Sequence, residues 1–314
     1  TLIDTETLYK RIKELAQEIN EYFGVEKTLN VICVLKGAAM FCTELSKNLK
    51  MPLKFEYITL SSYGNSTTSS GKSVLKVGME AAYAPFNWSQ NDDSNGAVQI
   101  GDTKEYAAGY DVEIAKRIAE GLDMELEIVK TDWDGLIPSI QSGAIDIIIA
   151  GMSPNAKRLE TIDFTDIYYN SNFVVVVKAD GPYANASSLK DFAGAKITAQ
   201  QGTNHYDIMI DQLEGVNKQV AATDFGSMRV QLQSGAIDGY VSERPEGISA
   251  EQAMKNITFV DPGFKADISD TAIAVGLKKG SVLKEKINEV LAGISQEDRE
   301  KFMEDAIANQ PSAK

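Results

Sequence analysis

The residues "IQSGAIDIIIAGMS" (140–153) recur, offset by 92 positions, as "LQSGAIDGYVSERP" (232–245). In each copy a helix is predicted to end at a glycine, Gly143 or Gly235, which can adopt the left-handed conformation of a helix cap. A strand follows each glycine directly. An offset of 92 residues is too wide for a solenoid and is typical of two similar lobes. The repeat therefore predicts a molecule built from two lobes.

The strands of the two repeats lead into small or polar residues. One strand leads to Gly151 and Ser153, and the other leads to Glu243. Open α/β sheets bind ligands beyond the carboxyl ends of their strands. Two such lobes that face each other would place these three residues across one cleft. The repeat alone thus suggests a two-lobed clamp.

Strands and helices alternate on both sides of the repeats, from about residue 74 onward. This alternation predicts an α/β fold with largely parallel sheets. The preceding part of the chain contains an incomplete β-α-β fragment, with a helix over 7–23, a strand over 29–35, a helix to about residue 49 and a strand over 53–60.

A linker joins the two parts. Nine of the twelve residues from Ser62 to Ser73 are Ser, Thr or Gly, which is typical of a flexible tether. The predicted organisation is therefore an N-terminal fragment over 1–61, a linker over 62–73 and a larger α/β part that begins at residue 73.

The composition disfavours several classes of partner. The 314 residues include 45 acidic and 31 basic side chains, for a formal net charge of -14. This charge opposes binding to nucleic acid or to an anionic membrane surface and favours cations. No stretch approaches the roughly 20 apolar residues of a membrane span. The two cysteines, Cys33 and Cys42, lie in apolar runs, where two buried thiols are favoured over a disulfide.

Two aromatic residues and one acid are candidates to hold a cation. Glu80 follows the apolar strand 74–79 and Tyr83 comes three residues later, although taken alone they could equally be a solvated acid and a packed ring. Trp133 stands between two aspartates, an unusual place for a residue that prefers the core. A cation over both rings, with Glu80 at its end, would be stabilised by the ring quadrupoles and by charge.

A second group of residues suits an anion. Arg158 follows a strand end and a turn, where its guanidinium could grip a carboxylate with help from Ser153. A lone arginine is more often part of a surface ion pair, so this inference depends on its surroundings. Thr203 and Asn204 lie at a strand-glycine-helix junction, where backbone N–H groups meet anions. With Glu243 as acceptor for an ammonium group, the two groups of residues describe a cationic α-amino acid.

Nothing in the sequence nominates a catalytic centre. His205 is the only histidine, and there is no metal-ligand cluster, no G-x-S-x-G elbow, no P-loop and no G-x-G-x-x-G fingerprint. We therefore predict a binding protein without catalytic residues, metal or cofactor.

The chain from about residue 73 to 314 resembles the family 3 extracellular solute-binding proteins, the polar amino-acid receptors of ABC transporters. Five stretches that follow the order of that family carry the resemblance: "EAAYAPFNW" (80–88), "GYDVEIAKRIAEGL" (109–122), "DWDGLIPSIQSGAIDIIIAGMSPNAKRLETIDFTDIYY" (132–169), "GTNH" (202–205) and "SERPEG" (242–247). The resemblance implies two Rossmann-like lobes of the periplasmic-binding-protein type II, joined by two hinge strands. Lobe 1 would comprise 73–176 and 266–314, and lobe 2 would comprise 179–262.

The same resemblance implies how the two ends of an amino acid would be held. Arg158 would bind the ligand carboxylate together with Ser153 and Asn204. Glu243 and the carbonyl of Gly151 would bind the amino group.

The resemblance also implies a place for the ligand side chain. Tyr83 and Trp133 would enclose it, and Glu80 would meet its charged end. Two departures from the family pattern affect lobe 2: Asn204 replaces a second hydroxyl residue, and His205 stands where Gln is frequent.

As partners, the resemblance implies a free amino acid and an ABC-transporter permease, in an extracytoplasmic location. Glu80, the aromatic pair and the acidic surface favour arginine or lysine as ligand. Glutamine is an alternative, because a carboxylate also accepts a hydrogen bond from an amide. The chain begins at Thr1 without a signal peptide, and we expect its export signal to lie outside this sequence.

Residues 1–72 resemble the N-terminal part of a hypoxanthine phosphoribosyltransferase. "VLKGAAMF" (34–41) is similar to the pyrophosphate loop of that family, and "SSYGNSTTSSG" (61–71) to its mobile active-site loop. The paired acids and the Thr-Gly phosphate loop of such enzymes do not follow, so we expect no transferase activity from this fusion. Two parallel strands with two helices leave sheet edges and apolar faces uncovered. We therefore predict marginal order for this fragment, or docking on a partner.

Overall fold

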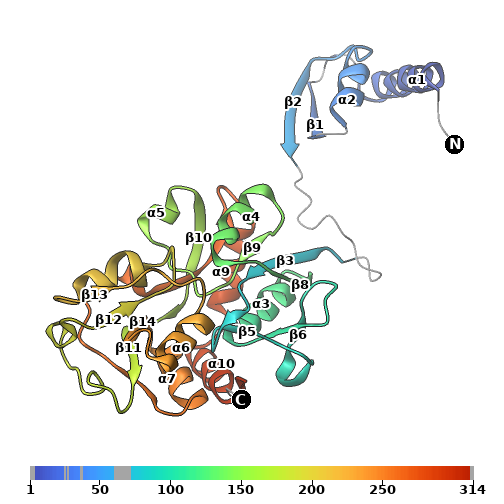
Figure 1. Ribbon diagram of the computed structural model, residues 1–314. Helices are drawn as coiled ribbons and strands as arrows, with labels where there is room; N and C mark the ends of the chain where they lie inside the picture. Colours follow the sequence, from blue (N-terminus) through green and yellow to red (C-terminus); the bar gives the residue numbers. More distant parts are fainter. Residues whose placement is uncertain (1–3, 25, 27, 36–37, 60–71, 312–314) are drawn as a thin grey trace. The chain divides into compact units, whose positions relative to one another are not determined.

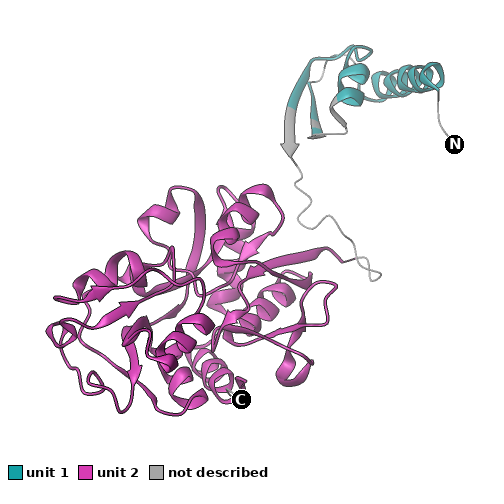
Figure 2. Cartoon of the chain, viewed as in Figure 1, with its two compact units in different colours: residues 1–62 teal, residues 63–314 magenta. Residues whose placement is uncertain are grey.

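The computed structural model of the protein describes residues 4–24, 26, 28–35, 38–59 and 72–311 (Figure 1). The chain forms two compact units, residues 1–62 and 63–314 (Figure 2). Most of the predicted linker over 62–73, and residues 36–37 of the stretch that is similar to a pyrophosphate loop, lie outside the described residues.

The described part of the first unit contains two helices and two strands, α1 (Thr5–Phe23), β1 (Leu29–Leu35), α2 (Ala38–Ser46) and β2 (Leu53–Thr59). Asp4 caps α1, because its carboxylate accepts the Thr7 N–H at 2.9 Å. β1 and β2 pair in parallel over their whole length. The predicted β-α-β fragment is therefore confirmed.

This unit buries little apolar surface. Among its described side chains, the buried apolar ones are Ile12, Ala16, Cys33 and Met51. Leu8 and Phe23, two large apolar side chains of α1, are 47% and 44% exposed. In the described part of the unit, the elements that can cover the apolar side chains of α1 are the short helix α2 and the two-stranded sheet. Both cysteines are free, as predicted, although Cys42 is only partly buried.

The second unit contains two five-stranded sheets that are built alike. The first has the strand order β10-β16-β9-β3-β8, formed by Ile162–Asn170, Ala272–Lys278, Ile147–Ile148, Val74–Met79 and Glu125–Lys130. The second has the order β13-β12-β14-β11-β15, formed by Asn217–Lys218, Lys196–Thr198, Gly239–Glu243, Phe173–Lys178 and Ile257–Val260. In each sheet three adjacent strands pair in parallel and the other two pairings are antiparallel. We call the first sheet with its helices lobe 1 and the second lobe 2.

The chain crosses between the lobes twice, once between Asn170 and Phe173 and once between Val260 and Ala272. β11 begins at Phe173 and pairs with β14 and β15 of lobe 2, whereas the sequence assigned residues up to 176 to lobe 1. The prediction of largely parallel sheets holds for only half of the pairings in these two five-stranded sheets. The antiparallel pairings involve the strands beside the crossings, whose direction cannot be read from an alternation of strands and helices.

Helices cover both sheets, and their bounds are α3 (Tyr110–Gly121), α4 (Leu136–Ser142), α5 (Ala156–Leu159), α9 (Leu283–Ala292) and α10 (Gln296–Asn309) in lobe 1, α6 (Phe225–Ser234) and α7 (Arg244–Ala253) in lobe 2, and α8 (Ile268–Thr271) in the second crossing. A small sheet, β4-β5-β7-β6, extends lobe 1 with strands at Ala82–Tyr83, Asn87–Gln90, Tyr106–Ala108 and Val98–Gln99. Single helical turns lie at Ser94–Gly96, Trp133–Gly135, Leu189–Phe192, His205–Met209 and Ile210–Gln212. None of the helices in the described ranges has the length and apolar character needed to span a membrane.

The helix ends predicted from the sequence repeat are confirmed. α4 ends at Gly143, with φ 80° and ψ 19°, and α6 ends at Gly235, with φ 77° and ψ 16°. Both residues lie in the left-handed region, where glycine has no steric penalty. β9 follows the first cap and β14 the second. The two repeats thus direct their strands to equivalent places in the two lobes.

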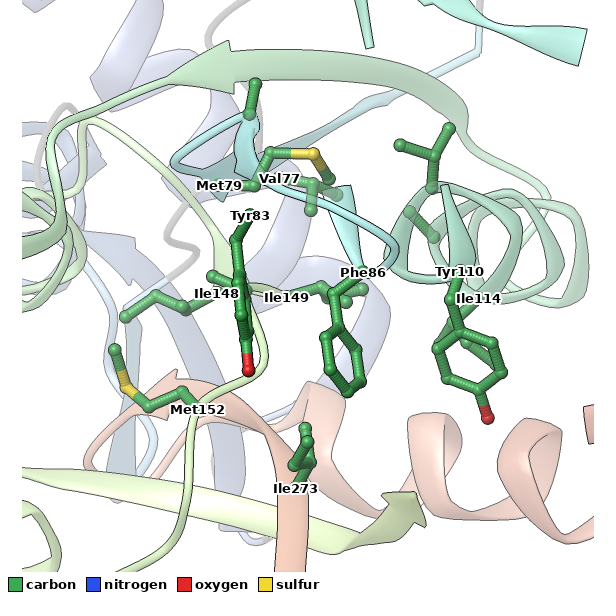
Figure 3. Close-up of a cluster of buried hydrophobic side chains, with 14 of the residues drawn as sticks. Val77, Met79, Tyr83, Phe86, Tyr110, Ile114, Ile148, Ile149, Met152 and Ile273 are labelled. Atoms are coloured by element: carbon green, nitrogen blue, oxygen red, sulfur yellow. The ribbon is translucent and has the colours of Figure 1, made fainter. Parts of the chain in front are cut away.

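The largest apolar cluster of this unit runs through both lobes. In lobe 1 it includes Val77, Met79 and Phe86, which lie side by side in Figure 3. The same cluster continues into lobe 2 through Phe225 and Tyr240. Because close-packed side chains resist displacement, this cluster holds the carboxyl ends of β3 and β9 in place.

Candidate ligand-binding site

The predicted site residues lie beyond the strand ends of both lobes. Trp133 is partly buried and the other eight are buried. Lobe 1 contributes Glu80, Tyr83, Trp133, Gly151, Ser153 and Arg158, and lobe 2 contributes Thr203, Asn204 and Glu243.

Direct contacts hold the two lobes closed on each other. The Trp133 Nε1–H donates to the Gly202 carbonyl at 3.3 Å, and the Asn155 amide donates to Asn204 Oδ1 at 2.7 Å. Each of these bonds joins a loop of lobe 1 to the loop that follows β12 of lobe 2. The structure is therefore a closed form of the clamp.

Arg158 is a buried cation with no ion pair among the described residues, although the charge of Asp207 acts on it. It lies in α5, which Asn155 caps by accepting the Arg158 backbone N–H at 2.9 Å. Its guanidinium donates to the carbonyls of Ser153 at 2.9 Å and Gly202 at 3.1 Å, and lies 5.1 Å from the centre of the Trp133 ring. Burial lowers the pKa of this group to about 10. A guanidinium has five N–H donors, so this one can also serve an anion.

Glu80 is a buried acid at the other end of the site. Its Oε1 accepts a hydrogen bond from Gln200 Nε2 of lobe 2 at 2.8 Å. Burial raises the pKa of Glu80 to about 7, with smaller contributions from Asp224 and other acids nearby, while the Gln200 bond opposes the rise. A cation that reached Glu80 would reverse this shift.

The Tyr83 ring stacks on two other rings of the protein. Phe86 lies 4.9 Å away and Phe225 of lobe 2 lies 4.3 Å away, both between ring centres. The Tyr83 hydroxyl is buried and has no hydrogen-bond partner among the described residues. The sequence paired Tyr83 with Trp133, whereas here Phe225 is the ring that faces it across the lobes and Trp133 lies against Arg158.

Glu243 is buried and faces the only histidine. Its Oε1 lies 3.3 Å from His205 Nε2, although the two atoms lack hydrogen-bond geometry, and its Oε2 has no partner among the described residues. Burial raises the pKa of Glu243 to about 8, with a contribution from Glu246. Burial, and then the charge of Arg158, lower the pKa of His205 to about 3. We infer a neutral His205 beside a protonated Glu243, because neither side chain has another partner in the described part of the chain to stabilise its charge.

The remaining candidates are Gly151 and three polar residues whose side chains donate hydrogen bonds to other groups of the protein. Gly151 has φ 62°, and a Cβ there would lie 2.8 Å from Tyr83 Cε1. The Ser153 hydroxyl donates to the Asp270 carbonyl at 3.0 Å, and Asn204 Nδ2 donates to Asp270 Oδ1 at 3.1 Å. Thr203 donates to the Gln200 carbonyl at 2.6 Å.

A cavity of about 240 Å³ lies beside Arg158 between the lobes, lined by residues that include Trp133, Asn155 and Asn204. Larger cavities of about 490 and 650 Å³ lie along the C-terminal helix α10 and contain none of the predicted site residues. The volume of a cavity therefore does not identify the candidate site. The site is identified by the buried charged side chains, of which Arg158 lies beside the smaller cavity. No group of residues in the described ranges has the composition and spacing of a metal site.

Three further residues contact the predicted site residues and were not predicted as part of the site. They are Gln200, which bonds to Glu80, His205, which lies beside Glu243, and Phe225, which stacks on Tyr83. A signal for Phe225 was present, because the sequence repeat extends upstream. "TDW" (131–133) and "TDF" (223–225) are related by the same offset of 92 residues, which pairs Trp133 with Phe225.

A two-lobed α/β fold that encloses buried charged groups between its lobes defines a class of proteins that bind a small molecule by closing around it. The chain belongs to the bacterial extracellular solute-binding proteins, family 3, whose model matches residues 75–305. The model of the phosphoribosyl transferase domain matches residues 1–83, in agreement with the resemblance of the N-terminal fragment.

Several relatives match the second unit over most of their length. The arginine-binding extracellular protein ArtP of Bacillus subtilis is 29% identical over 240 residues, which cover 74% of this chain and 86% of that protein. A crystal structure of an amino acid ABC transporter substrate-binding protein from Streptococcus pneumoniae bound to L-arginine has a TM-score of 0.66 at 27% identity, and the match covers 75% of this chain and 94% of that one. An ancestral arginine-binding protein bound to glutamine has a TM-score of 0.60 at 29% identity, with 74% and 96% covered. The second unit therefore has the periplasmic-binding-protein type II fold, as predicted.

Proposed function

We propose that this protein is the amino-acid receptor of an ABC importer and that its ligand is arginine or lysine. The charges buried between the lobes carry the proposal. Arg158, Glu80 and Glu243 are all buried, and none of them forms an ion pair with an Asp, Glu, Lys or Arg side chain among the described residues. One cation and two acids complement a carboxylate, an α-ammonium group and a cationic side chain.

Arg158 would hold the ligand carboxylate with the N–H groups that its two carbonyl contacts leave free. Ser153, Thr203 and Asn204 would also donate to the carboxylate once it replaces their present acceptors, Asp270 and the Gln200 carbonyl. Glu243 would accept from the α-ammonium group, since its Oε2 lacks a partner among the described residues, and the Gly151 carbonyl would accept as well.

The ligand side chain would pass between aromatic rings toward Glu80. Tyr83 and Phe225 lie only 4.3 Å apart in the closed form. A planar cation between two rings needs about 3.5 Å on each face, so it would replace this contact and hold the two rings about 3 Å further apart than they are here. Trp133 borders the carboxylate end beside Arg158. Because the ligand bridges both lobes, binding shifts the population toward the closed form.

Glutamine, or another polar amino acid, is the alternative ligand. Glu80 already accepts from the Gln200 amide, so it would accept from a ligand amide in the same way. The ancestral arginine-binding protein bound to glutamine shows that the two ligands are compatible with a related site.

Calorimetric titration of the full chain with arginine, lysine and glutamine tests the proposal. We expect arginine or lysine to bind more tightly than glutamine. In the Glu80→Gln variant, the affinity for the cationic ligand falls at least about tenfold, because a charge-assisted bond is replaced by a neutral one. The affinity for glutamine changes by less than about threefold.

Glu120→Gln is the matched control, since Glu120 lies exposed on α3 and the substitution removes the same charge. It leaves every affinity unchanged. A wild-type protein that binds glutamine and neither basic amino acid would overturn the choice of ligand, and failure to bind any amino acid would overturn the proposed function.

We further propose that the receptor works outside the cytoplasm and delivers its ligand to a permease. The family to which residues 75–305 belong is extracellular, and the relative from Streptococcus pneumoniae is a component of an amino acid ABC transporter.

A purine phosphoribosyltransferase activity is the second candidate, favoured by the family match over residues 1–83. We expect none, because that match ends where the solute-binding part begins and the acids of the phosphoribosyl site are missing from the sequence. Formation of a nucleotide from hypoxanthine and phosphoribosyl pyrophosphate by the full chain would prove this expectation wrong.

A further inference from the structure

We propose that Asn87, Asp111 and Tyr168 form a buried brace that positions two binding loops of lobe 1, those at Glu80 and Gly151. The inference rests on the proposed function, because it takes these loops as ligand contacts. The three residues come from three different elements, β5, α3 and β10.

A continuous chain of hydrogen bonds runs through the brace. The Ala81 N–H donates to Asn87 Oδ1 at 2.8 Å, and Asn87 Nδ2 donates to Asp111 Oδ2 at 2.7 Å. The Tyr168 hydroxyl donates to Asp111 Oδ1 at 2.7 Å and accepts the Gly151 N–H at 3.4 Å. The chain thus connects the backbone beside Glu80 to the backbone of the second loop.

Both ends of this chain lie at left-handed backbone positions, of which the one at Ala81 is strained. Ala81, the residue after Glu80, has φ 53°, a left-handed conformation that an alanine rarely adopts. Gly151 has φ 62°. The Ala81 N–H donates to Asn87, and the Gly151 N–H donates to Tyr168, so each left-handed residue is bonded to a side chain of the brace. The direction of Glu80 and of the Gly151 carbonyl therefore depends on these bonds.

A role in packing alone does not account for the brace. Asp111, Asn87 and Tyr168 are all fully buried, and burial raises the pKa of Asp111 to about 6. A buried carboxylate is unfavourable unless its oxygens are satisfied, and apolar side chains would fill the same space at less cost. The neighbouring rings of Tyr83, Phe86 and Tyr110 fill space in that way (Figure 3).

Tyr168→Phe tests the brace, with Tyr110→Phe as the matched control. Both tyrosines are fully buried, and the Tyr110 hydroxyl donates to the Tyr168 carbonyl at 3.0 Å and, among the described residues, forms no hydrogen bond with either loop. Tyr168→Phe removes two buried hydrogen bonds, one to Asp111 and one from Gly151, whereas Tyr110→Phe removes one, so we expect the melting temperature to fall more in Tyr168→Phe. The affinity for L-arginine falls about tenfold in Tyr168→Phe, as for the loss of a bond to a charged group, and less than about twofold in Tyr110→Phe.

An exchange of charge within the brace provides a rescue. Asp111→Asn alone leaves Asn87 or Tyr168 without its acceptor, so affinity falls. In the double variant Asn87→Asp with Asp111→Asn, residue 87 still accepts from Ala81, residue 111 donates to it, and Tyr168 again has an acceptor. We expect this double variant to recover most of the affinity.

Amide exchange in the absence of ligand separates this inference from the proposed function. The amides of Ala81 and Gly151 exchange faster in Tyr168→Phe than in Tyr110→Phe if the brace holds them. Equal exchange at these amides, equal loss of affinity in the two variants, or no rescue by the double variant would each overturn the brace. A wild-type protein that binds no amino acid, while those amides respond as expected, would overturn the proposed function instead.

Discussion

Glu80 and Glu243 are acids that the closed protein buries before any ligand cation reaches them. Burial raises their pKa values from 4.5 to about 7 and about 8. The folded protein therefore retains protons on these groups at a pH where the unfolded chain has already lost them. Protonation of these two side chains links ligand binding and stability to pH.

We predict that the ligand-free protein becomes less stable between pH 6.5 and pH 8. In this window the folded state binds more protons than the unfolded chain at Glu80 and Glu243, so the free energy of unfolding falls as the pH rises, by about 1–2 kcal/mol. His205 opposes this fall by less than about 0.5 kcal/mol, because with a folded pKa of about 3 it is neutral in the folded state, whereas the unfolded side chain, with its ordinary pKa of 6.5, is half protonated at pH 6.5. Urea unfolding at the two pH values measures the change.

Glu243→Gln is the control, and it removes the larger part of this dependence because the pKa of Glu243 lies closer to pH 8. A cationic ligand favours the ionised carboxylates, so the affinity for arginine is expected to rise over the same window with release of protons. Stability that stays constant or rises from pH 6.5 to 8 would mean that both acids are already ionised in the folded protein.

Single residues of the site could be proposed from the sequence when their chemistry was unusual for their place. Trp133 between two aspartates and Arg158 after a strand end are examples, and both lie between the lobes in the structure. Their partners were harder to propose, because partners depend on how the lobes close. The sequence around Phe225 predicts an ordinary core residue. Only when the repeat is extended upstream does Phe225 pair with Trp133 and become a candidate for the site.

At the scale of elements, the two sequence repeats produce the same helix cap and then different strand ends. Gly143 and Gly235 have nearly the same φ and ψ, whereas one strand leads to Gly151 and the other ends at Glu243. The shared part of the repeat therefore serves the fold, and the part that differs provides two kinds of contact to one cleft.

We predict that Gly151→Ala weakens ligand binding strongly, whereas Gly143→Ala lowers stability and leaves binding nearly unchanged. Both residues have positive φ, 62° and 80°, so both substitutions introduce backbone strain of about 1 kcal/mol. A Cβ at Gly143 meets nothing within 4 Å, but one at Gly151 lies 2.8 Å from Tyr83 Cε1. Tyr83 or the loop must then move. Calorimetry with arginine, together with thermal unfolding of both variants, measures the difference.

The expected loss of affinity in Gly151→Ala is more than about tenfold, and in Gly143→Ala less than about twofold. If both variants bind arginine like the wild type, the loop at Gly151 does not contact the ligand.

The elements themselves could largely be predicted from the sequence, but their pairing could not. The strands over 29–35, 53–60 and 74–79 match β1, β2 and β3 within a residue. β11 was given to the wrong lobe because its apolar run, "FVVVV" (173–177), suits a buried strand in either sheet. Hydrophobic periodicity identifies a strand and its buried faces, whereas the choice of neighbour depends on contacts far away in the sequence.

At the scale of the whole molecule, the candidate site lies entirely within the second unit, and all its residues fall between Glu80 and Glu243. We predict that a truncated chain that begins at Lys72 binds arginine with an affinity within about twofold of the full chain. Titration of both proteins under the same conditions measures this. A large loss of affinity in the truncated chain, with its fold intact by circular dichroism, would assign the first unit a part in binding.

The first unit is expected to be far less stable than the second. β1 and β2 form a two-stranded sheet, and isolated pairs of strands are at best marginal in water. Large apolar side chains of this unit remain exposed, among them Tyr22 at 83% and Met40 at 82%. Hydrogen exchange of the full chain should therefore show the amides of β1 and β2 exchanging at least about a hundredfold faster than those of β3 and β11, which are paired on both sides. Protection of β1 and β2 equal to that of β3 would contradict this, and would indicate either a fold of independent stability or a second molecule that covers the exposed apolar side chains.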